Sequence, residues 1–422
     1  MQRESESISK DNLSSNESTR SVTKAVSDLE DWISSSNWIG YDPYDIKGEQ
    51  FYLQLAKGKS FPKRAVCKIL FELIETAPLL TRKLFKVKPT VNAKAMGLFT
   101  AAYARLYLID NKTDYLGKAL QCADWLLQHP SKGYSGLCWG YPFDWQSVIF
   151  IPKGTPSGVV TSIVGEGLWL LYEITNDKRY LDACKDICLF FTKGLNITYE
   201  DQDRLCFSYT PLDDYMVHNA NLFVAEFLAG IGSKTNNPNW IDIAIKCGNF
   251  AVADQNPDGT LCYWAKSQQA SHSGGVCRMD HYHAGFEIRK LYGLWKITGD
   301  ENFRKAYLSY LVFYKNNFIG ENAFPKMTPR DYFPVNIHSC AEAILLTSTL
   351  SEDHAECRNL AKDFFQWTIK NMQIRPGQYR YMIRKMFGQS KSDMPYIRWN
   401  QAWMFRALSE LKYCLCSCSR GA

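Results

Sequence analysis

Apolar residues recur at helical spacing along most of this chain, and the helical segments come in pairs. Between Asp280 and Tyr314, a loop rich in titratable and aromatic residues leads into an apolar helix, a short break at Thr298–Asp300 and a second, amphipathic helix. The same order of loop, apolar helix, break and amphipathic helix recurs at intervals of roughly 55–70 residues, which is the signature of a repeat architecture.

The pattern predicts five complete helix pairs. Their first helices begin at Gly97, Gly165, Asn221, Gly285 and Cys340, and the breaks lie at 111–114, 175–177, 233–239, 298–300 and 351–353. A sixth apolar helix, Ala402–Leu411, has no partner after it, and the amphipathic helix Ser21–Ser34 has none before it. If these two helices pack side by side, six pairs close into a ring with the more apolar first helices inside. We therefore predict an all-α fold, an (α/α)6 toroid.

This fold divides the chain into three segments. Residues 1–23 are polar and rich in Ser, Glu and Asn, which is typical of a disordered leader. Residues 24–413 form a single toroid domain, within which Pro62–Phe85 is a helical segment outside the repeat, basic at its end. Residues 414–422 form a Cys-rich tail.

The loops that lead into the inner helices are long, roughly 20–30 residues, and loops of that length in a compact domain are usually functional. They share short alternating aromatic segments that predict small β-hairpins, at 136–141, 205–209, 260–264, 324–327 and 378–381. By the symmetry of the repeat, these loops lie at one end of the ring, together with the N-termini of the inner helices. The pattern thus places an aromatic funnel at that end.

Composition and charge narrow the possible functions only a little. The chain has 422 residues, of which 46% are hydrophobic and 22% charged, as in an ordinary globular protein. Its net charge of +6 and the lack of a long basic run argue against a dedicated nucleic-acid binder. No apolar run is long enough for a transmembrane helix, and Met1–Thr23 lacks the apolar core of a secretory signal, so we expect a cytoplasmic protein.

The 14 cysteines agree with a reducing compartment. Five of them lie in apolar helical segments, where a reduced Cys acts as a small hydrophobic residue: Cys122, Cys184, Cys188, Cys247 and Cys340. No Cys or His pair with zinc spacing accompanies Cys414, Cys416 and Cys418 in the tail. We expect neither a metal nor another cofactor.

The loops before the inner helices supply carboxylates among aromatic residues, a combination that suits carbohydrates. Apolar sugar faces stack on Trp and Tyr, while sugar hydroxyls bind polar side chains. Two carboxylates from different loops can act as acid and base, or as acid and nucleophile, across a glycosidic bond. We predict catalytic roles for Asp280, His283, Asp144 and Asp42, with Asp280 and either Asp144 or Asp42 as the carboxylate pair. The predicted substrate-binding residues are Tyr41, Asp45, Trp139, Tyr141, Trp145, Gln146, His218, His281, His338, Arg398 and Trp399.

The same residues allow other functions. His283 and His338, or tyrosines, could carry protons in the epimerisation or β-elimination of a uronic acid or N-acyl sugar. A toroid that binds glycans without chemistry is a third possibility. Each loop carboxylate also has a structural alternative as a helix cap or turn former, and we interpret Asp177 and Asp300, at the opposite end, as structural. In every case the expected partner is an oligosaccharide, a polysaccharide or a glycan precursor.

Four segments carry a resemblance to a known class of proteins: Trp38–Asp45, Trp139–Gln146, Asp280–Phe286 and Arg398–Trp403. They resemble the corresponding segments of bacterial and archaeal exopolysaccharide-biosynthesis proteins of the six-hairpin toroid class, over nearly the whole chain after residue 24. That wider class includes glycosidases, unsaturated-uronyl hydrolases, polysaccharide lyases and sugar epimerases. The resemblance implies carbohydrate chemistry in a polysaccharide pathway, but it does not select the reaction, because one fold hosts many activities.

Overall fold

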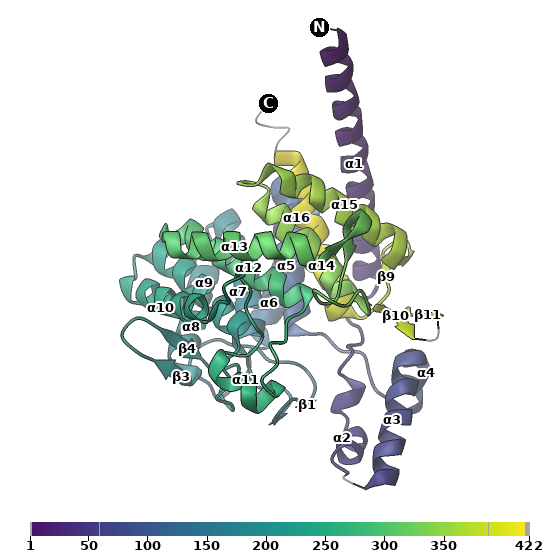
Figure 1. The fold of residues 1–422 in the computed structure, drawn as a ribbon, viewed down its shortest axis with the longest axis vertical. Coiled ribbons are helices and arrows are strands. Elements are labelled where there is room, and N and C mark those ends of the chain that lie inside the picture. Colours follow the sequence, from purple (N-terminus) through teal and green to yellow (C-terminus); the bar gives the residue numbers. More distant parts are fainter. Residues whose placement is uncertain (1, 59, 387, 418–422) are drawn as a thin grey trace.

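The computed structural model describes residues 2–58, 60–386 and 388–417, and it consists mainly of helices (Figure 1). The contacts between the helices arrange twelve of them in an inner and an outer layer. The inner helices are α5 (Ala93–Asp110), α7 (Gly158–Thr175), α9 (His218–Thr235), α12 (His281–Thr298), α14 (Ile337–Leu350) and α16 (Trp403–Ser417). The outer helices are α1 (Gln2–Ser35), α6 (Thr113–Gln128), α8 (Lys178–Gly194), α10 (Pro238–Asp254), α13 (Glu301–Asn317) and α15 (Ala355–Met372).

The inner helices close into a ring. Each one contacts the next along the chain, and the last, α16, packs against the first, α5. Five outer helices pack on the inner helix that precedes them, and α1 packs on α16. The predicted (α/α)6 toroid is therefore confirmed, including the closure of the ring by the N-terminal and C-terminal helices.

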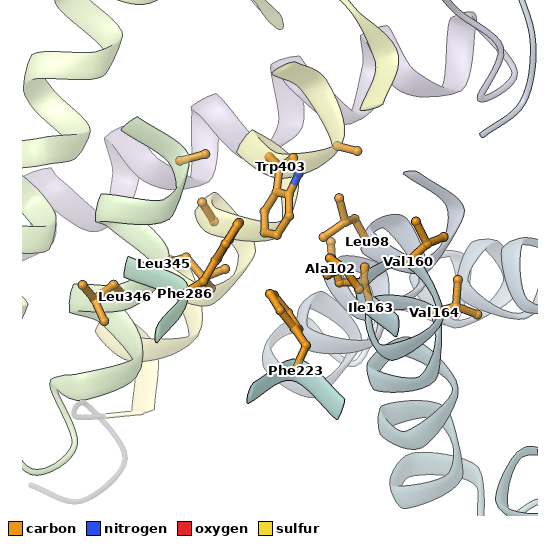
Figure 2. Close-up of a cluster of buried hydrophobic side chains, with 14 of the residues drawn as sticks. Leu98, Ala102, Val160, Ile163, Val164, Phe223, Phe286, Leu345, Leu346 and Trp403 are labelled. Carbon is orange, nitrogen blue, oxygen red and sulfur yellow. The ribbon is translucent and has the colours of Figure 1, made fainter. Parts of the chain in front are cut away.

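Apolar side chains from all six inner helices meet inside the ring. Figure 2 shows part of this core, with residues labelled from α5, α7, α9, α12, α14 and α16. Helices α5 and α7 lie close together at Gly97, where an added Cβ atom would lie 2.8 Å from the Cα atom of Val164. The absence of a Cβ at this crossing lets the two backbones touch.

The turns at the far end of the ring repeat one design. The inner helices α5, α7, α9 and α12 end at residues in the left-handed conformation, Asn111, Asn176, Asn236 and Gly299. In two of these turns the next outer helix is capped by an aspartate, Asp177 or Asp300, whose carboxylate accepts a backbone N–H of the first turn. The structural role predicted for these two aspartates is confirmed.

The inner helices begin earlier than the hydrophobic pattern predicted. Helix α7 begins at Gly158 instead of Gly165, α12 at His281 instead of Gly285, and α14 at Ile337 instead of Cys340. The first turns carry polar and titratable residues, which the pattern assigned to loops. As a result, several candidate site residues lie on helix N-termini, where packing fixes their direction.

Short antiparallel pairs lie in the loops. The strands are β1 (Trp145–Gln146), β2 (Phe150–Ile151), β3 (Ile197–Glu200), β4 (Leu205–Phe207), β5 (Ile319–Gly320), β6 (Phe324–Pro325), β7 (Val335–Asn336), β8 (Gln373–Arg375), β9 (Gln378–Tyr379), β10 (Met382–Met386) and β11 (Gly388–Ser392). The hairpins β3–β4, β5–β6 and β8–β9 confirm three of the five predicted hairpins. The predictions for 136–141 and 260–264 were wrong, because these segments form only isolated bridges to distant residues, Gly140 to Pro156 and Trp264 to Val217.

Three helices form a lobe outside the ring: α2 (Gln50–Ala56), α3 (Phe61–Thr76) and α4 (Pro78–Leu84). Helices α3 and α4 correspond to the predicted helical segment Pro62–Phe85, which Pro78 divides in two, whereas α2 lies before that segment. The remaining short elements are α11 (Lys266–Ser273), η1 (Ile46–Gly48), η2 (Glu321–Ala323) and the π-helical η3 (Ile397–Ala402).

At the two ends of the chain, helices extend into the segments predicted as leader and tail. Helix α1 already begins at Gln2, where a disordered leader was predicted, and Figure 1 shows its first part extending away from the ring. Cys414 and Cys416 belong to α16, whereas Cys418 lies outside the described residues. Within the described ranges, no helix has both the length and the apolarity needed to cross a membrane.

Candidate functional site

A cavity of about 130 Å³ lies at the end of the ring where the inner helices begin. Its lining combines residues of the preceding loops with residues of the first helical turns: Tyr44, Lys94, Tyr141, Phe143, Trp145, Val159, Tyr209, Asn219, Tyr263, Tyr282, His283, Phe286, His338, Arg398 and Trp399. All six repeats contribute to it, as expected for the predicted funnel. Most of the lining is aromatic, and none of these residues is a carboxylate.

His283 is oriented by Asp280. Asp280 caps helix α12, and its Oδ1 accepts the backbone N–H of His283 at 3.0 Å. Its other oxygen, Oδ2, lies 2.7 Å from Nδ1 of His283. Since a carboxylate accepts hydrogen bonds, Nδ1 is the donating nitrogen, and Nε2 remains for a ligand in the cavity.

His338 lies in the same cavity without a polar partner. It is buried, and among the described residues neither of its ring nitrogens has a hydrogen-bond partner. Its ring stacks on Tyr282 at 4.7 Å between centroids and lies 4.8 Å from the ring of Trp399. Burial lowers the pKa of His338 well below its ordinary value, so the ring is neutral at pH 7. Both ring nitrogens are therefore available to a ligand in the cavity.

Two cations complete the cavity. Arg398 lies in η3, a π-helical segment of the kind that often marks functional sites. Its Nε and one terminal nitrogen donate to the two oxygens of Asp42 at 2.5 and 2.8 Å. Lys94 lies in the first turn of α5, with its Nζ 5.4 Å from the centroid of the Trp403 ring. Burial, and secondarily the charge of Arg398, lowers the pKa of Lys94 to about 7.

The structure thus brings six of the predicted site residues to the cavity wall: Tyr141, Trp145, His283, His338, Arg398 and Trp399. Two further candidates do not line the cavity but form hydrogen bonds with residues that do. Asp280 holds His283, and Asp42 neutralises Arg398.

The other carboxylates predicted for the site lie outside the cavity lining. Asp45 forms a buried ion pair with Arg82, 2.6 Å from its guanidinium. Asp144 lies in the loop between Phe143 and Trp145, but its carboxylate accepts from the backbone N–H of Lys153 at 2.7 Å and from Gln50 at 3.2 Å. No pair of carboxylates faces the cavity, among the residues that the structure describes.

The remaining candidates also lie outside the cavity lining. Tyr41 packs against the Arg82 guanidinium, Trp139 is buried and donates from Nε1 to the carbonyl of Leu126, and Gln146 is exposed. His281 is buried between the carbonyl of Lys326 and the hydroxyl of Tyr314, and burial lowers its pKa to about 4.

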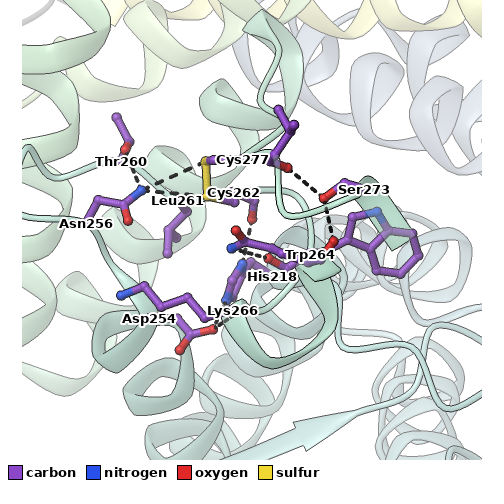
Figure 3. Close-up of a disulfide and its surroundings, with 12 residues drawn as sticks. His218, Asp254, Asn256, Thr260, Leu261, Cys262, Trp264, Lys266, Ser273 and Cys277 are labelled. Carbon is purple, nitrogen blue, oxygen red and sulfur yellow. Dashed lines mark hydrogen bonds and ion pairs between the residues drawn. A yellow bond between two sulfur atoms is a disulfide. The ribbon is translucent and has the colours of Figure 1, made fainter. Parts of the chain in front are cut away.

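His218 belongs to a second cluster beside the cavity, which Figure 3 shows. Its Nδ1 lies 2.6 Å from the carbonyl oxygen of Cys262, and its Nε2 lies 3.2 Å from Asp254. Cys262 forms a disulfide with Cys277. The disulfide joins the segment that carries Tyr263 to the segment that ends at Asp280, so it fixes two parts of the site relative to each other.

The disulfide was not predicted, because Cys262 and Cys277 lie in irregular loops that carry no pairing signal. The five cysteines predicted to act as small hydrophobic residues are free and buried. No group of three or more His, Cys, Asp or Glu side chains is placed to hold a metal ion in the described part of the chain.

Several cavity residues were missed by sequence reasoning: Lys94, Phe143, Val159, Tyr209, Tyr263 and Phe286. The tyrosines had a usable signal, since they lie in or next to the loops that precede the inner helices. Lys94 had a weaker one, as a single lysine at the start of an otherwise apolar helix.

Comparison with known proteins gives the fold an independent test. No protein-family model matches the chain, and no curated protein matches it in sequence. Among solved structures, it is similar to the cellobiose 2-epimerase from Bacillus thermoamylovorans, with a TM-score of 0.58 and 12% identity over 78% of this chain and 88% of that one. It is also similar to a D-mannose isomerase, with a TM-score of 0.57 and 14% identity over 76% of this chain and 86% of the other.

An α-mannanase from Bacteroides thetaiotaomicron is similar to the same degree, with a TM-score of 0.57 and 13% identity over 77% of this chain and 87% of that one. These three neighbours, which share one toroidal fold, are thus an epimerase, an isomerase and a glycoside hydrolase. At these identities the likeness establishes the fold, and the reaction has to be argued from the cavity.

Proposed function

We propose that this protein is a carbohydrate-active enzyme that transfers a proton at a sugar carbon next to a carbonyl or carboxylate group. Epimerisation, isomerisation and β-elimination all begin with such a step. The observation that carries the proposal is the pair of histidines in one aromatic cavity: His283 held by Asp280, and His338 with both ring nitrogens unpaired among the described residues.

The two histidines suit opposite roles. His338 is neutral and has an accepting nitrogen, so it takes the proton from carbon, and the electrons of the C–H bond move onto the adjacent oxygen. His283, whose ring Asp280 orients through Nδ1, returns a proton from Nε2 to the carbon skeleton. In the reverse reaction the two roles are exchanged.

The rest of the cavity supports this chemistry. Lys94 and Arg398 supply positive charge for the oxygen that becomes negative during proton abstraction, or for a uronate carboxylate. Tyr and Trp rings offer faces for a sugar to stack on. A volume of about 130 Å³ holds roughly ten water molecules, which approaches the non-hydrogen atoms of one hexose.

The proposed substrate is a sugar unit of a polysaccharide or of its precursor. Two observations support this choice. Four segments of the chain resemble exopolysaccharide-biosynthesis proteins, and the fold is similar to those of a cellobiose 2-epimerase and a D-mannose isomerase. The assignment to exopolysaccharide synthesis is part of the proposal.

Hydrolysis of a glycosidic bond is the second candidate. It is favoured by the partial exposure of the Asp280 side chain, 20%, beside the cavity, which would allow this carboxylate to reach a substrate. A paired carboxylate would have to come from Asp42 or Asp144, and both already accept hydrogen bonds from protein groups.

The test is incubation of the protein with reducing sugars and uronic acids in D₂O, followed by mass spectrometry of the recovered sugar. We expect deuterium at the carbon next to the carbonyl or carboxylate, and a loss of at least about 100-fold in the His283→Gln and His338→Gln variants. His129→Gln, on an exposed histidine outside the cavity, is the matched control.

Other outcomes would contradict the proposal in distinct ways. Release of a shortened glycan without deuterium uptake would indicate hydrolysis. Binding of sugar without turnover or exchange would indicate a glycan-binding toroid.

A further inference from the structure

The lobe formed by α2, α3 and α4 is separate from the toroid core. Figure 1 shows it projecting from the ring, and α3 packs mainly on α2 and α4. Its own small core consists of Ile46, Ile74 and Val87, with Phe51, Tyr52 and Leu70 packed against them. The lobe contributes no residue to the cavity lining, so its surface is free to serve another purpose.

The lobe exposes an unusual amount of apolar surface. Eight of the nineteen large hydrophobic side chains that are exposed among the described residues lie within residues 61–85: Phe61, Val66, Ile69, Leu73, Leu79, Leu80, Leu84 and Phe85. Phe61 is 85% exposed and Leu84 71% exposed. On α3, Val66, Ile69 and Leu73 share one face at spacings of three and four residues. A concentration of this kind marks an interaction surface.

The same segment has a strongly positive net charge. Residues 61–88 contain seven Lys or Arg and two Glu, a net charge of +5 in a chain whose total is +6. Six of these cations are exposed: Lys63, Arg64, Lys68, Lys83, Lys86 and Lys88. The seventh, Arg82, is buried against Asp45.

The two acidic residues do not offset this charge. Glu75 is buried and accepts from both Lys47 and Arg384, and Glu72 lies 3.8 Å from Arg384. The outer surface of the lobe therefore presents aliphatic side chains and cations, with its acids engaged by cations of other segments.

We propose that this lobe docks the protein on an anionic lipid surface. Aliphatic side chains on one helix face flanked by Lys and Arg are the composition of helices that lie in the membrane interface. The cations are attracted to anionic headgroups, and the Leu, Ile, Val and Phe side chains enter the boundary of the acyl chains.

Charge argues against a second copy of the chain as the occupant. A symmetric dimer through this face would oppose two surfaces that each carry six exposed cations, and like charges opposed across an interface are unfavourable. The aliphatic composition also argues against a protein partner, because the residues that dominate protein interfaces are Trp, Tyr and Arg.

The test is flotation of the full chain with phosphatidylcholine vesicles, with and without one third phosphatidylglycerol. We expect binding to the anionic vesicles that weakens as salt is raised. Ile69→Glu with Leu73→Glu should weaken it by at least about tenfold. Each of Lys63→Glu and Lys68→Glu should weaken it by roughly fivefold or more.

Matched controls come from outer helices. Leu189→Glu with Val312→Glu changes two exposed aliphatic residues of α8 and α13, and Lys305→Glu changes an exposed lysine of α13. These variants should bind vesicles as the wild type does. Circular dichroism of each variant establishes that the fold is kept.

Three results would overturn the proposal. The wild type could fail to float with either vesicle, or the lobe variants could bind as well as the controls. Alternatively, light scattering could detect a dimer that Ile69→Glu with Leu73→Glu abolishes, which would make a second copy the occupant of this face. Sugar turnover in solution is measured separately, so failure of lipid binding leaves the proposed function untouched.

Discussion

The ion pair between Asp42 and Arg398 allows a sharp test of how the site is built. Both residues are buried, and the carboxylate accepts from Nε and a terminal nitrogen of the guanidinium at 2.5 and 2.8 Å. Sequence analysis predicted a catalytic role for Asp42, whereas the geometry assigns it to positioning Arg398. The substitution Asp42→Asn separates the two roles, because it removes the negative charge and keeps the size of the side chain.

The expected cost follows from the burial of the pair. An uncompensated charge left in a protein interior typically costs about 3–5 kcal/mol, and Arg398 is only 1% exposed. The asparagine oxygen can still accept the backbone N–H of Tyr44, which Asp42 accepts at 3.1 Å, so the loss comes mainly from the charge. For a protein of this size, we expect the urea midpoint of unfolding to fall by about 1 M.

A double-mutant cycle measured by urea unfolding checks the reasoning. Arg398→Met removes the buried charge, so Asp42→Asn should cost much less in that background, with a coupling free energy of at least about 2 kcal/mol. Asp144→Asn, at a partly exposed carboxylate, is the control and should cost less than about 1 kcal/mol. If Asp42→Asn abolished activity but left the urea midpoint unchanged, Asp42 would be a substrate-contacting carboxylate and the positioning role would be wrong.

Three further predictions concern stability. Burial lowers the pKa of Lys94 from 10.5 to about 7, so between these pH values the unfolded chain binds a proton that the native protein lacks, and native stability rises with pH. Lys94→Met should therefore stabilise the protein against urea most at pH 6 and progressively less toward pH 10; an equal gain at every pH would refute this. Replacing Cys262 and Cys277 by Ser should cost about 3 kcal/mol for a loop of 15 residues, and reductant should lower the melting temperature of the wild type but not of the variant. Gly97→Ala should lower the melting temperature because its Cβ would meet the α7 backbone, whereas Gly117→Ala, with open space, should leave it unchanged or raise it slightly.

The sequence by itself determined the architecture. The period of the apolar residues located the helix pairs, and the unpartnered helices at the two ends implied the closed ring that α1 and α16 form. The symmetry of the repeat then identified the end at which the loops and helix N-termini meet. These features depend on local periodicity, which a single chain displays directly.

Only the tertiary structure decided which loop residues face the cavity. Asp42 meets Arg398 across 356 residues of chain, and the disulfide joins loops whose sequences carry no pairing signal. A loop rich in acids and aromatics indicates a site, but the direction of each side chain depends on partners from other repeats. For that reason the sequence predicted site roles for Asp45 and Asp144, whose carboxylates bind other parts of the protein outside the cavity lining. For the same reason Lys94 was missed, although it lines the cavity.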